Sequence, residues 1–178
     1  MNFARAARLF FACMLVATAG SAGTTVRSGV ADPQPVWDSV SWPFLHDEWG
    51  TGQAFRCERE HCGVDARLFV RMKRGFCNCV QGVADDAEVD RLTDFAFFGA
   101  PSRPLGSGRA VALGDMSGRM RAFALDSAEA PSRRAVSLVV AKDCEALVVT
   151  LISRRPAWTG PDINVPEFLP RTVLADLP

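Results

Sequence analysis

The chain has 178 residues, of which 48% are hydrophobic and 22% are charged, and its formal net charge is zero. This ordinary apolar content and low net charge exclude an intrinsically disordered chain. Electrostatic binding of nucleic acid is also excluded, because it needs a surplus of basic residues to displace counterions from phosphates. The length predicts one domain.

The N-terminus has the three parts of a secretory signal peptide. Two arginines precede an apolar run, Leu9–Ala19, and small residues follow this run as far as Ala22. The run is shorter than the roughly 20 apolar residues that span a bilayer, so we expect a cleaved leader and not a membrane anchor. The predicted organisation is a signal peptide over residues 1–22, with cleavage after Ala19 or Ala22, and a flexible arm over residues 23–35.

A chain that loses this leader is expected to be periplasmic or secreted. Without residues 1–22 it retains eighteen basic and twenty acidic residues, which makes it mildly acidic. No later stretch is long and apolar enough to cross a bilayer, so we expect no stable membrane insertion after signal cleavage.

An aromatic segment, Val36–Gly52, opens the predicted domain and contains three of the four tryptophans. Pro43 and Gly50 interrupt helical structure, and indole rings bury a large area, so we expect this segment to lie over a sheet. An exposed stacking surface for a ligand is the alternative. His46 in this segment is half of a possible metal or acid–base site, or more simply a surface or hydrogen-bonded residue.

Two strands are predicted after the aromatic segment, at Gln53–Cys57 and Ala66–Met72. The second shows strict alternation, which places successive side chains on opposite faces of a sheet. One face would carry Leu68, Val70 and Met72, and the other Arg67, Phe69, Arg71 and Lys73.

The clearest helix is predicted over Asp85–Phe98. Asp85 is a favourable N-cap, and Glu88 three residues later completes a capping box. Gly99 then ends the helix. Its apolar face would consist of Val89, Leu92, Phe95 and Ala96.

The second half of the chain predicts further antiparallel strands. Hairpin-length connections and prolines divide it, and the prolines after Arg154 predict no long regular structure there. Residues 36–178 are thus expected to form a single α+β domain with an antiparallel sheet of five to seven strands, one main helix packed on it and a Pro-rich tail. The predicted strands are Arg109–Leu113, Arg119–Leu125, Ala135–Ala141 and Glu145–Ile152, with a loop at Pro101–Gly108 and turns at Gly114–Gly118 and Lys142–Cys144.

Five cysteines remain after the leader is removed, and an oxidising compartment would join them into two disulfides with one thiol left over. Sequence alone leaves fifteen pairings open. We expect Cys57 and Cys62 to close the four-residue loop between them, and Cys77 or Cys79 to pair with Cys144. A Cys77–Cys79 bridge would be strained, because the two residues are only two positions apart.

The same sulfurs allow a different chemistry. Four thiols in the pattern C-x4-C-x14-C-x-C, with His61 beside the second, could bind Zn²⁺ or Cu⁺. The C-x-C pair departs from the usual zinc spacing, but a strained Cys77–Cys79 bridge would exchange readily with other thiols. A periplasmic thiol-redox or copper/zinc-handling protein using Cys77 and Cys79 is therefore the alternative hypothesis, with His61 as a further metal candidate.

Basic side chains suggest an anion-binding surface. Arg67, Arg71 and Lys73 share one strand face, and Arg119 and Arg121 share a face of another. If those strands are neighbours, the five residues form a patch that could receive a carboxylate, a phosphate or an acidic partner. The alternative is a solvated outer face, or one paired with the acidic helix.

A stretch around the C-x-C pair carries a family resemblance. The sequence GFCNCVQGVADD begins at Gly75 and follows an F-x-C motif ending at Cys57 and a C-G motif at Cys62. This arrangement resembles a group of small, exported, uncharacterised proteins of Gram-negative bacteria, over about residues 40–100. The resemblance implies export to the periplasm and implies no activity.

Catalytic motifs are missing from the sequence. It has no G-x-S-x-G, no phosphate-binding P-loop, no dinucleotide-binding glycine motif and no tyrosine. Nothing therefore predicts a catalytic residue or a cofactor. The leading hypothesis is an exported, disulfide-stabilised binding or accessory module for an unknown protein or a small anionic ligand.

Overall fold

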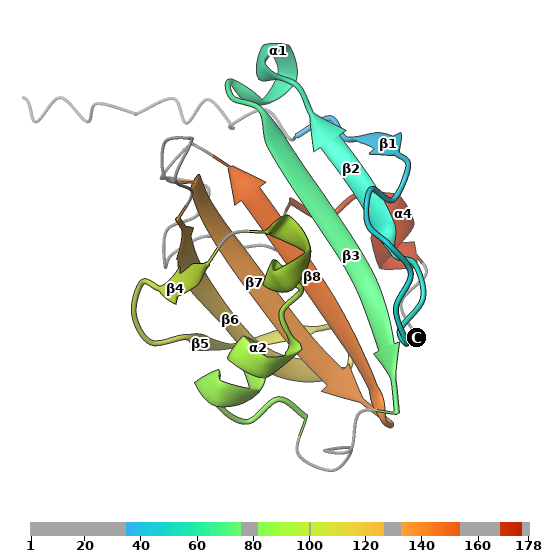
Figure 1. Cartoon of the computed structure of the whole chain (residues 1–178). Coiled ribbons are helices and arrows are strands. Elements are labelled where there is room, and N and C mark those ends of the chain that lie inside the picture. The colour runs from blue at the N-terminus through green and yellow to red at the C-terminus, as the bar shows by residue number, and fades with distance from the viewer. Residues whose placement is uncertain (1–34, 76–81, 100, 127–132, 154–167, 176–178) are drawn as a thin grey trace, which may run out of the picture. The chain divides into compact units, whose positions relative to one another are not determined.

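The structure is a computed structural model of the chain (Figure 1), and it describes residues 35–75, 82–99, 101–126, 133–153 and 168–175. The predicted leader and nearly all of the predicted arm lie outside these residues. So do Cys77 and Cys79.

Within the described residues, eight strands form one antiparallel sheet with the order β1-β2-β3-β8-β7-β6-β4, and β5 also pairs with β6. The antiparallel sheet is confirmed, but it has more strands than the five to seven expected. The difference arises because β1 and β4 are only three residues long, too short for an alternating pattern. The strands are β1 (Asp38–Val40), β2 (Gln53–Cys57), β3 (Ala66–Arg74), β4 (Ser102–Pro104), β5 (Arg109–Leu113), β6 (Met116–Leu125), β7 (Arg133–Lys142) and β8 (Glu145–Ser153).

The central hairpin joins β7 to β8 through two residues, Asp143 and Cys144. Both have positive φ, 49° and 67°, as a type I′ hairpin turn requires. Lys142 pairs with Glu145 across the turn, so the predicted hairpin is confirmed with a shorter connection. The β5–β6 turn is likewise shorter than predicted, because β6 already begins at Met116.

Each face of the sheet carries its own apolar core. The helix face includes Phe69, Val139 and Val148, which pack with Val89 of α2. The opposite face includes Leu68, Val149 and Val173 of α4. Figure 1 accordingly shows α2 on the near side of the sheet and α4 on the far side. The alternation predicted for β3 is confirmed, because its odd-numbered and even-numbered residues enter different cores.

The helices differ from expectation in three places, and the first is a short helix, α1 (Arg59–Cys62), in the loop expected between Cys57 and Cys62. The predicted helix is interrupted: α2 (Asp86–Leu92) ends before Asp94, and a separate 3₁₀ helix, η1 (Phe95–Phe98), follows. The N-terminal end of α2 is capped as predicted, because the Asp85 side chain accepts a hydrogen bond from the Glu88 N–H at 2.9 Å. A short helix, α4 (Arg171–Ala175), forms in the region predicted to lack regular structure.

The aromatic segment packs against the sheet, as expected: Trp42 and Phe44 lie on the helix face, whereas Trp37 packs against the opposite core. Phe44 stacks on Phe97 of η1 with ring centroids 5.0 Å apart, and it also contacts Phe69 of β3 at 5.2 Å. Trp42 meets Phe44 edge to face at 5.2 Å. These contacts join the segment, η1 and the sheet into one aromatic cluster, and they favour packing over the alternative of a free stacking surface.

Candidate anion-binding site

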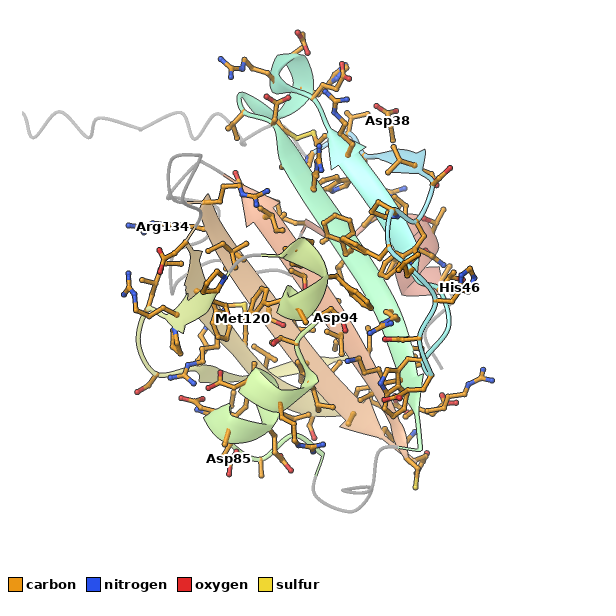
Figure 2. The ribbon with its side chains drawn as sticks, in the orientation of Figure 1. Asp38, His46, Asp85, Asp94, Met120 and Arg134 are labelled. Atoms are coloured by element: carbon orange, nitrogen blue, oxygen red, sulfur yellow. A yellow bond between two sulfur atoms is a disulfide. The ribbon has the colours of Figure 1, made fainter. Side chains whose placement is uncertain are left out.

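Arg71 and Lys73, two members of the predicted basic patch, are buried and neutralised. Both side chains bind the carboxylate of Asp94, which is itself buried where α2 gives way to η1 (Figure 2 labels Asp94). The Arg71 guanidinium contacts both Asp94 oxygens, with Nε 3.2 Å from Oδ2. The Lys73 ammonium lies 2.9 Å from Asp94 Oδ1 and donates to the Leu92 carbonyl at 2.8 Å. These two residues are therefore not free to receive a ligand.

Asp47 of the aromatic segment completes this network. Arg71 donates to Asp47 Oδ1 at 2.8 Å, and its guanidinium lies 4.9 Å from the centroid of Phe97. Burial raises the pKa of Asp47, but hydrogen bonds from Arg71 and the Trp49 N–H, and the charges of Arg71 and Lys73, outweigh it and lower the pKa below 3.8. The buried cations thus fasten the aromatic segment to the sheet.

Arg119 and Arg121 are also engaged, with the acidic side of α2. Arg119 Nε lies 2.9 Å from Asp86 Oδ1, and Arg121 lies 2.7 Å from Asp90 Oδ2. The predicted patch required the two strands to be neighbours, but β8 and β7 lie between β3 and β6 in the sheet. The five residues are therefore not one surface, and pairing with the acidic helix, the alternative considered above, accounts for four of them.

An arginine-lined pocket opens at the end of the sheet where β3 begins and β8 ends. It encloses about 330 Å³, near the roughly 300 Å³ lower limit of small-ligand sites. We call it the arginine pocket. Its lining includes Arg56, Arg59, Arg67, Arg133, Asp65 and Ile152.

Strand register brings these arginines together. Arg56 of β2 lies directly opposite Arg67 of β3, and Ile152 of β8 is the next residue across the sheet. Arg133 begins β7, beyond β8. Arg59 comes from α1 (Arg59–Cys62), the short helix between β2 and β3.

The acidic residues near the pocket neutralise only part of its charge. Arg56 lies 3.5 Å from Glu58 and 3.8 Å from Asp65, and Arg59 lies 3.8 Å from Asp65. Among the described residues no acid pairs with Arg67 or Arg133. The Nε atom of Arg133 is buried and has no hydrogen-bond partner there.

This arrangement has a cost to stability that a bound anion would remove. Like charges placed opposite each other across a strand pair are destabilising, and Arg56 and Arg67 are such a pair. A buried donor without a partner costs about 1–3 kcal/mol. Guanidinium groups bind phosphate and carboxylate oxygens in a two-point geometry, so an oxyanion could satisfy both defects.

The disulfide expected between Cys57 and Cys62 is confirmed, with Cα atoms 6.0 Å apart. The bridge closes the loop that contains Arg59. It also leaves Cys57 and Cys62 without the free thiols that the four-sulfur metal site would need. His61 is exposed beside it. Cys144 is also disulfide-bonded, and the choice between Cys77 and Cys79 as its partner stays a prediction.

The other metal and acid–base candidates are not brought together within the described part of the chain. There, no group of three histidine, cysteine or carboxylate side chains is placed to hold a metal ion. His46 is exposed at the outer edge of the aromatic segment (Figure 2).

Among the arginines of this pocket, Arg67 was a candidate from the sequence, whereas Arg56, Arg59 and Arg133 were not. One signal was present: Arg133 and Arg134 stand together at the start of the most apolar strand pair, where a charged side chain needs a partner or a function. The grouping itself depends on pairing between strands that are distant in sequence.

No helix among the described residues is long and apolar enough to cross a membrane. No protein-family model matches the chain, and no curated protein is significantly similar to it in sequence.

Proposed function

We propose that this protein is an exported, disulfide-stabilised binding module that holds a phosphate-type anion in the arginine pocket. The observation that carries the proposal is the pair of guanidinium groups, Arg67 and Arg133, that line one pocket without an acidic partner among the described residues. A binding role needs no catalytic group, which agrees with the absence of catalytic motifs from the sequence.

The charge of the pocket favours a dianion over a monocarboxylate. Two carboxylates lie within ion-pair distance of the four arginines, Asp65 in the lining and Glu58 beside Arg56. The remaining two positive charges match a phosphate monoester near neutral pH, which carries up to two negative charges. A monocarboxylate would leave one guanidinium uncompensated.

Export is part of the proposal. The leader-like N-terminus supports it, and so do the Cys57–Cys62 bridge and the disulfide-bonded Cys144, because such bridges persist in oxidising compartments. The thiol-redox and metal-handling alternative depends on Cys77 and Cys79, which lie outside the described residues. Counting free thiols in protein purified from the periplasm, by alkylation and mass spectrometry, tests that alternative.

The binding proposal is tested by titrating inorganic phosphate into the isotope-labelled protein and following backbone amide shifts by NMR. We expect saturable shifts at Arg67 and Arg133, and weaker binding of acetate. Each of Arg67→Gln and Arg133→Gln should weaken phosphate binding by about tenfold or more, because a charge-assisted hydrogen bond contributes about 1.5–3 kcal/mol.

Arg134→Gln is the matched control. Arg134 neighbours Arg133 on the same strand but points to the opposite face of the sheet, so this variant loses the same charge without touching the pocket. Equal losses in the Arg133 and Arg134 variants would show non-specific attraction to a basic surface. No saturable binding by the native protein would also overturn the proposal.

A further inference from the structure

A second pocket adjoins the arginine pocket and is apolar. It encloses about 220 Å³ between β1 and the start of β3, and its apolar lining is Val40, Pro43, Phe55 and Phe69. Arg56 and Arg67 line both pockets, so the two cavities meet at this cross-strand pair. We call the second cavity the apolar pocket.

The apolar pocket is formed by the free edge of the sheet. Within the described residues β1 is an edge strand whose one partner is β2, and all three residues of β1 are exposed. Val40 is 43% exposed and Pro43 is also exposed, whereas Phe69 in the same lining is buried. The two exposed apolar side chains offer contact area that a ligand could cover, and burying apolar area is favourable at about 25 cal/mol per Å².

The shared arginine pair constrains what one ligand would look like. Its charged group would contact Arg56 and Arg67 from the side of Arg133, and any substituent continuing past that pair would enter an apolar cavity. For scale, an apolar cavity of about 150 Å³ in another protein binds benzene, so the apolar pocket is large enough for a phenyl ring or a short hydrocarbon chain.

We infer that the natural ligand is an amphiphilic anion: a phosphate monoester whose organic substituent is a compact apolar group, aryl or short alkyl. The phosphate occupies the arginine pocket and the apolar substituent covers Val40 and Pro43 in the apolar pocket. This inference rests on the proposed function, because it assumes that the charged group binds in the arginine pocket. It adds the class of molecule to which that group is attached.

The test compares phenyl phosphate with inorganic phosphate on the full-length exported protein, by NMR titration at one fixed ionic strength. Phenyl phosphate is expected to bind about tenfold more tightly, and amide shifts are expected on β1 as well as at the arginine pocket. Val40→Asn makes the rim polar without changing its charge, and it should remove most of this advantage while leaving inorganic phosphate unaffected.

Val36→Asn is the matched control, because Val36 is also an exposed valine, at 52%, but does not line the apolar pocket. It should retain the full preference for phenyl phosphate. If inorganic phosphate binds but phenyl phosphate binds no more tightly, the ligand inference is wrong and the proposed function stands. If the preference exists but Val40→Asn leaves it unchanged, the ring binds elsewhere and the inference is also wrong. If neither compound binds, both proposals fall.

Discussion

The guanidinium of Arg71 and the carboxylate of Asp94 face each other as a two-point ion pair that is almost completely removed from solvent. Arg71 belongs to β3, and Asp94 lies where α2 gives way to η1, so the pair ties the helices to the sheet. Lys73 binds the same carboxylate. One carboxylate thus neutralises two buried cations. We therefore expect substitution of Asp94 to destabilise the fold more than any other substitution in this network.

Asp94→Asn should lower the free energy of unfolding by about 3–5 kcal/mol, because it leaves two buried cations without their main counter-charge. Chemical denaturation in guanidinium chloride measures the loss. Asp90→Asn is the control, because Asp90 pairs with Arg121 while 41% of its side chain is exposed, and such pairs contribute up to about 1 kcal/mol. Similar losses in the two variants would contradict the importance of the buried network.

The Cys57–Cys62 bridge is expected to serve both stability and binding. Replacing both residues with alanine should cost about 2 kcal/mol, since the bridge joins residues only five apart and loop closure then contributes modestly. It should also weaken phosphate binding, because Arg59 lies within the closed loop. Denaturation and NMR titration of the same variant separate the two effects. An unchanged phosphate affinity would mean that the bridge does not position Arg59.

The acid sensitivity of the fold should depend on Asp86. A hydrogen bond from the Gly108 N–H lowers the pKa of Asp86, burial opposes this shift, and Arg119 and Arg121 add to the lowering, so the net change is downward. Because the folded pKa lies below the unfolded value, ionised Asp86 stabilises the protein above its ordinary pKa of 3.8, and this contribution disappears as the pH falls through the folded pKa.

Asp86→Asn should therefore reduce stability at neutral pH and flatten the loss of stability on acidification below pH 3.8. Urea denaturation across that range gives both quantities. Asp38→Asn, at an exposed position on β1, should change neither. If the Asp86 variant loses stability on acidification as steeply as the native protein, ionised Asp86 does not stabilise the fold.

The centre of the sheet contains two buried hydroxyls, Thr150 and Ser137, paired across β8 and β7. Neither has a hydrogen-bond partner among the described residues. Thr150→Val keeps the shape and removes the unpaired oxygen, so we expect the free energy of unfolding to rise by about 1 kcal/mol.

Thermal unfolding monitored by circular dichroism provides the measurement. Thr93→Val is the contrast, because the Thr93 hydroxyl donates to the Asp90 carbonyl at 3.1 Å and its removal should not stabilise. A clear loss of stability in Thr150→Val would mean that its hydroxyl is hydrogen-bonded in the native protein.

Gly118 on β6 leaves no room for a side chain. A Cβ there would overlap the Val139 carbonyl oxygen and lie 2.7 Å from the Val140 Cα, both in the backbone of β7. Gly118→Ala should destabilise by about 2 kcal/mol or more, because backbone at the middle of a sheet cannot move aside. Gly99→Ala meets open space but has φ of +59°, so about 1 kcal/mol is expected there. If chemical denaturation shows equal destabilisation in the two variants, steric overlap with β7 is not what makes glycine necessary at position 118.

The local elements followed from the sequence because their signals are local. The strand Gln53–Cys57 was predicted with the bounds that β2 has, and the alternation in β3 correctly separated Leu68 from Phe69. The β7–β8 hairpin and the Asp85 cap were likewise readable, because a turn or a cap involves residues only a few positions apart.

The helix break at Asp94 could not be predicted in this way. A continuous helix satisfies the apolar periodicity through Phe95, but the structure ends α2 early, which leaves Asp94 against Arg71 and Lys73. The two cations that bind this carboxylate belong to β3, more than twenty residues earlier, so no local sequence pattern predicts where the helix ends.

By itself the sequence determined an antiparallel sheet with a capped helix and favoured the Cys57–Cys62 bridge among the possible pairings, because alternation, capping and short loops act over a few residues. Only the tertiary structure decided which cations are neutralised and which remain available. Pairing with Asp94 and with α2 removed four of the five candidate residues, and strand register placed Arg67 with Arg56, Arg59 and Arg133 instead. Charge compensation depends on distance in space, and register across the sheet sets that distance for residues far apart in the chain.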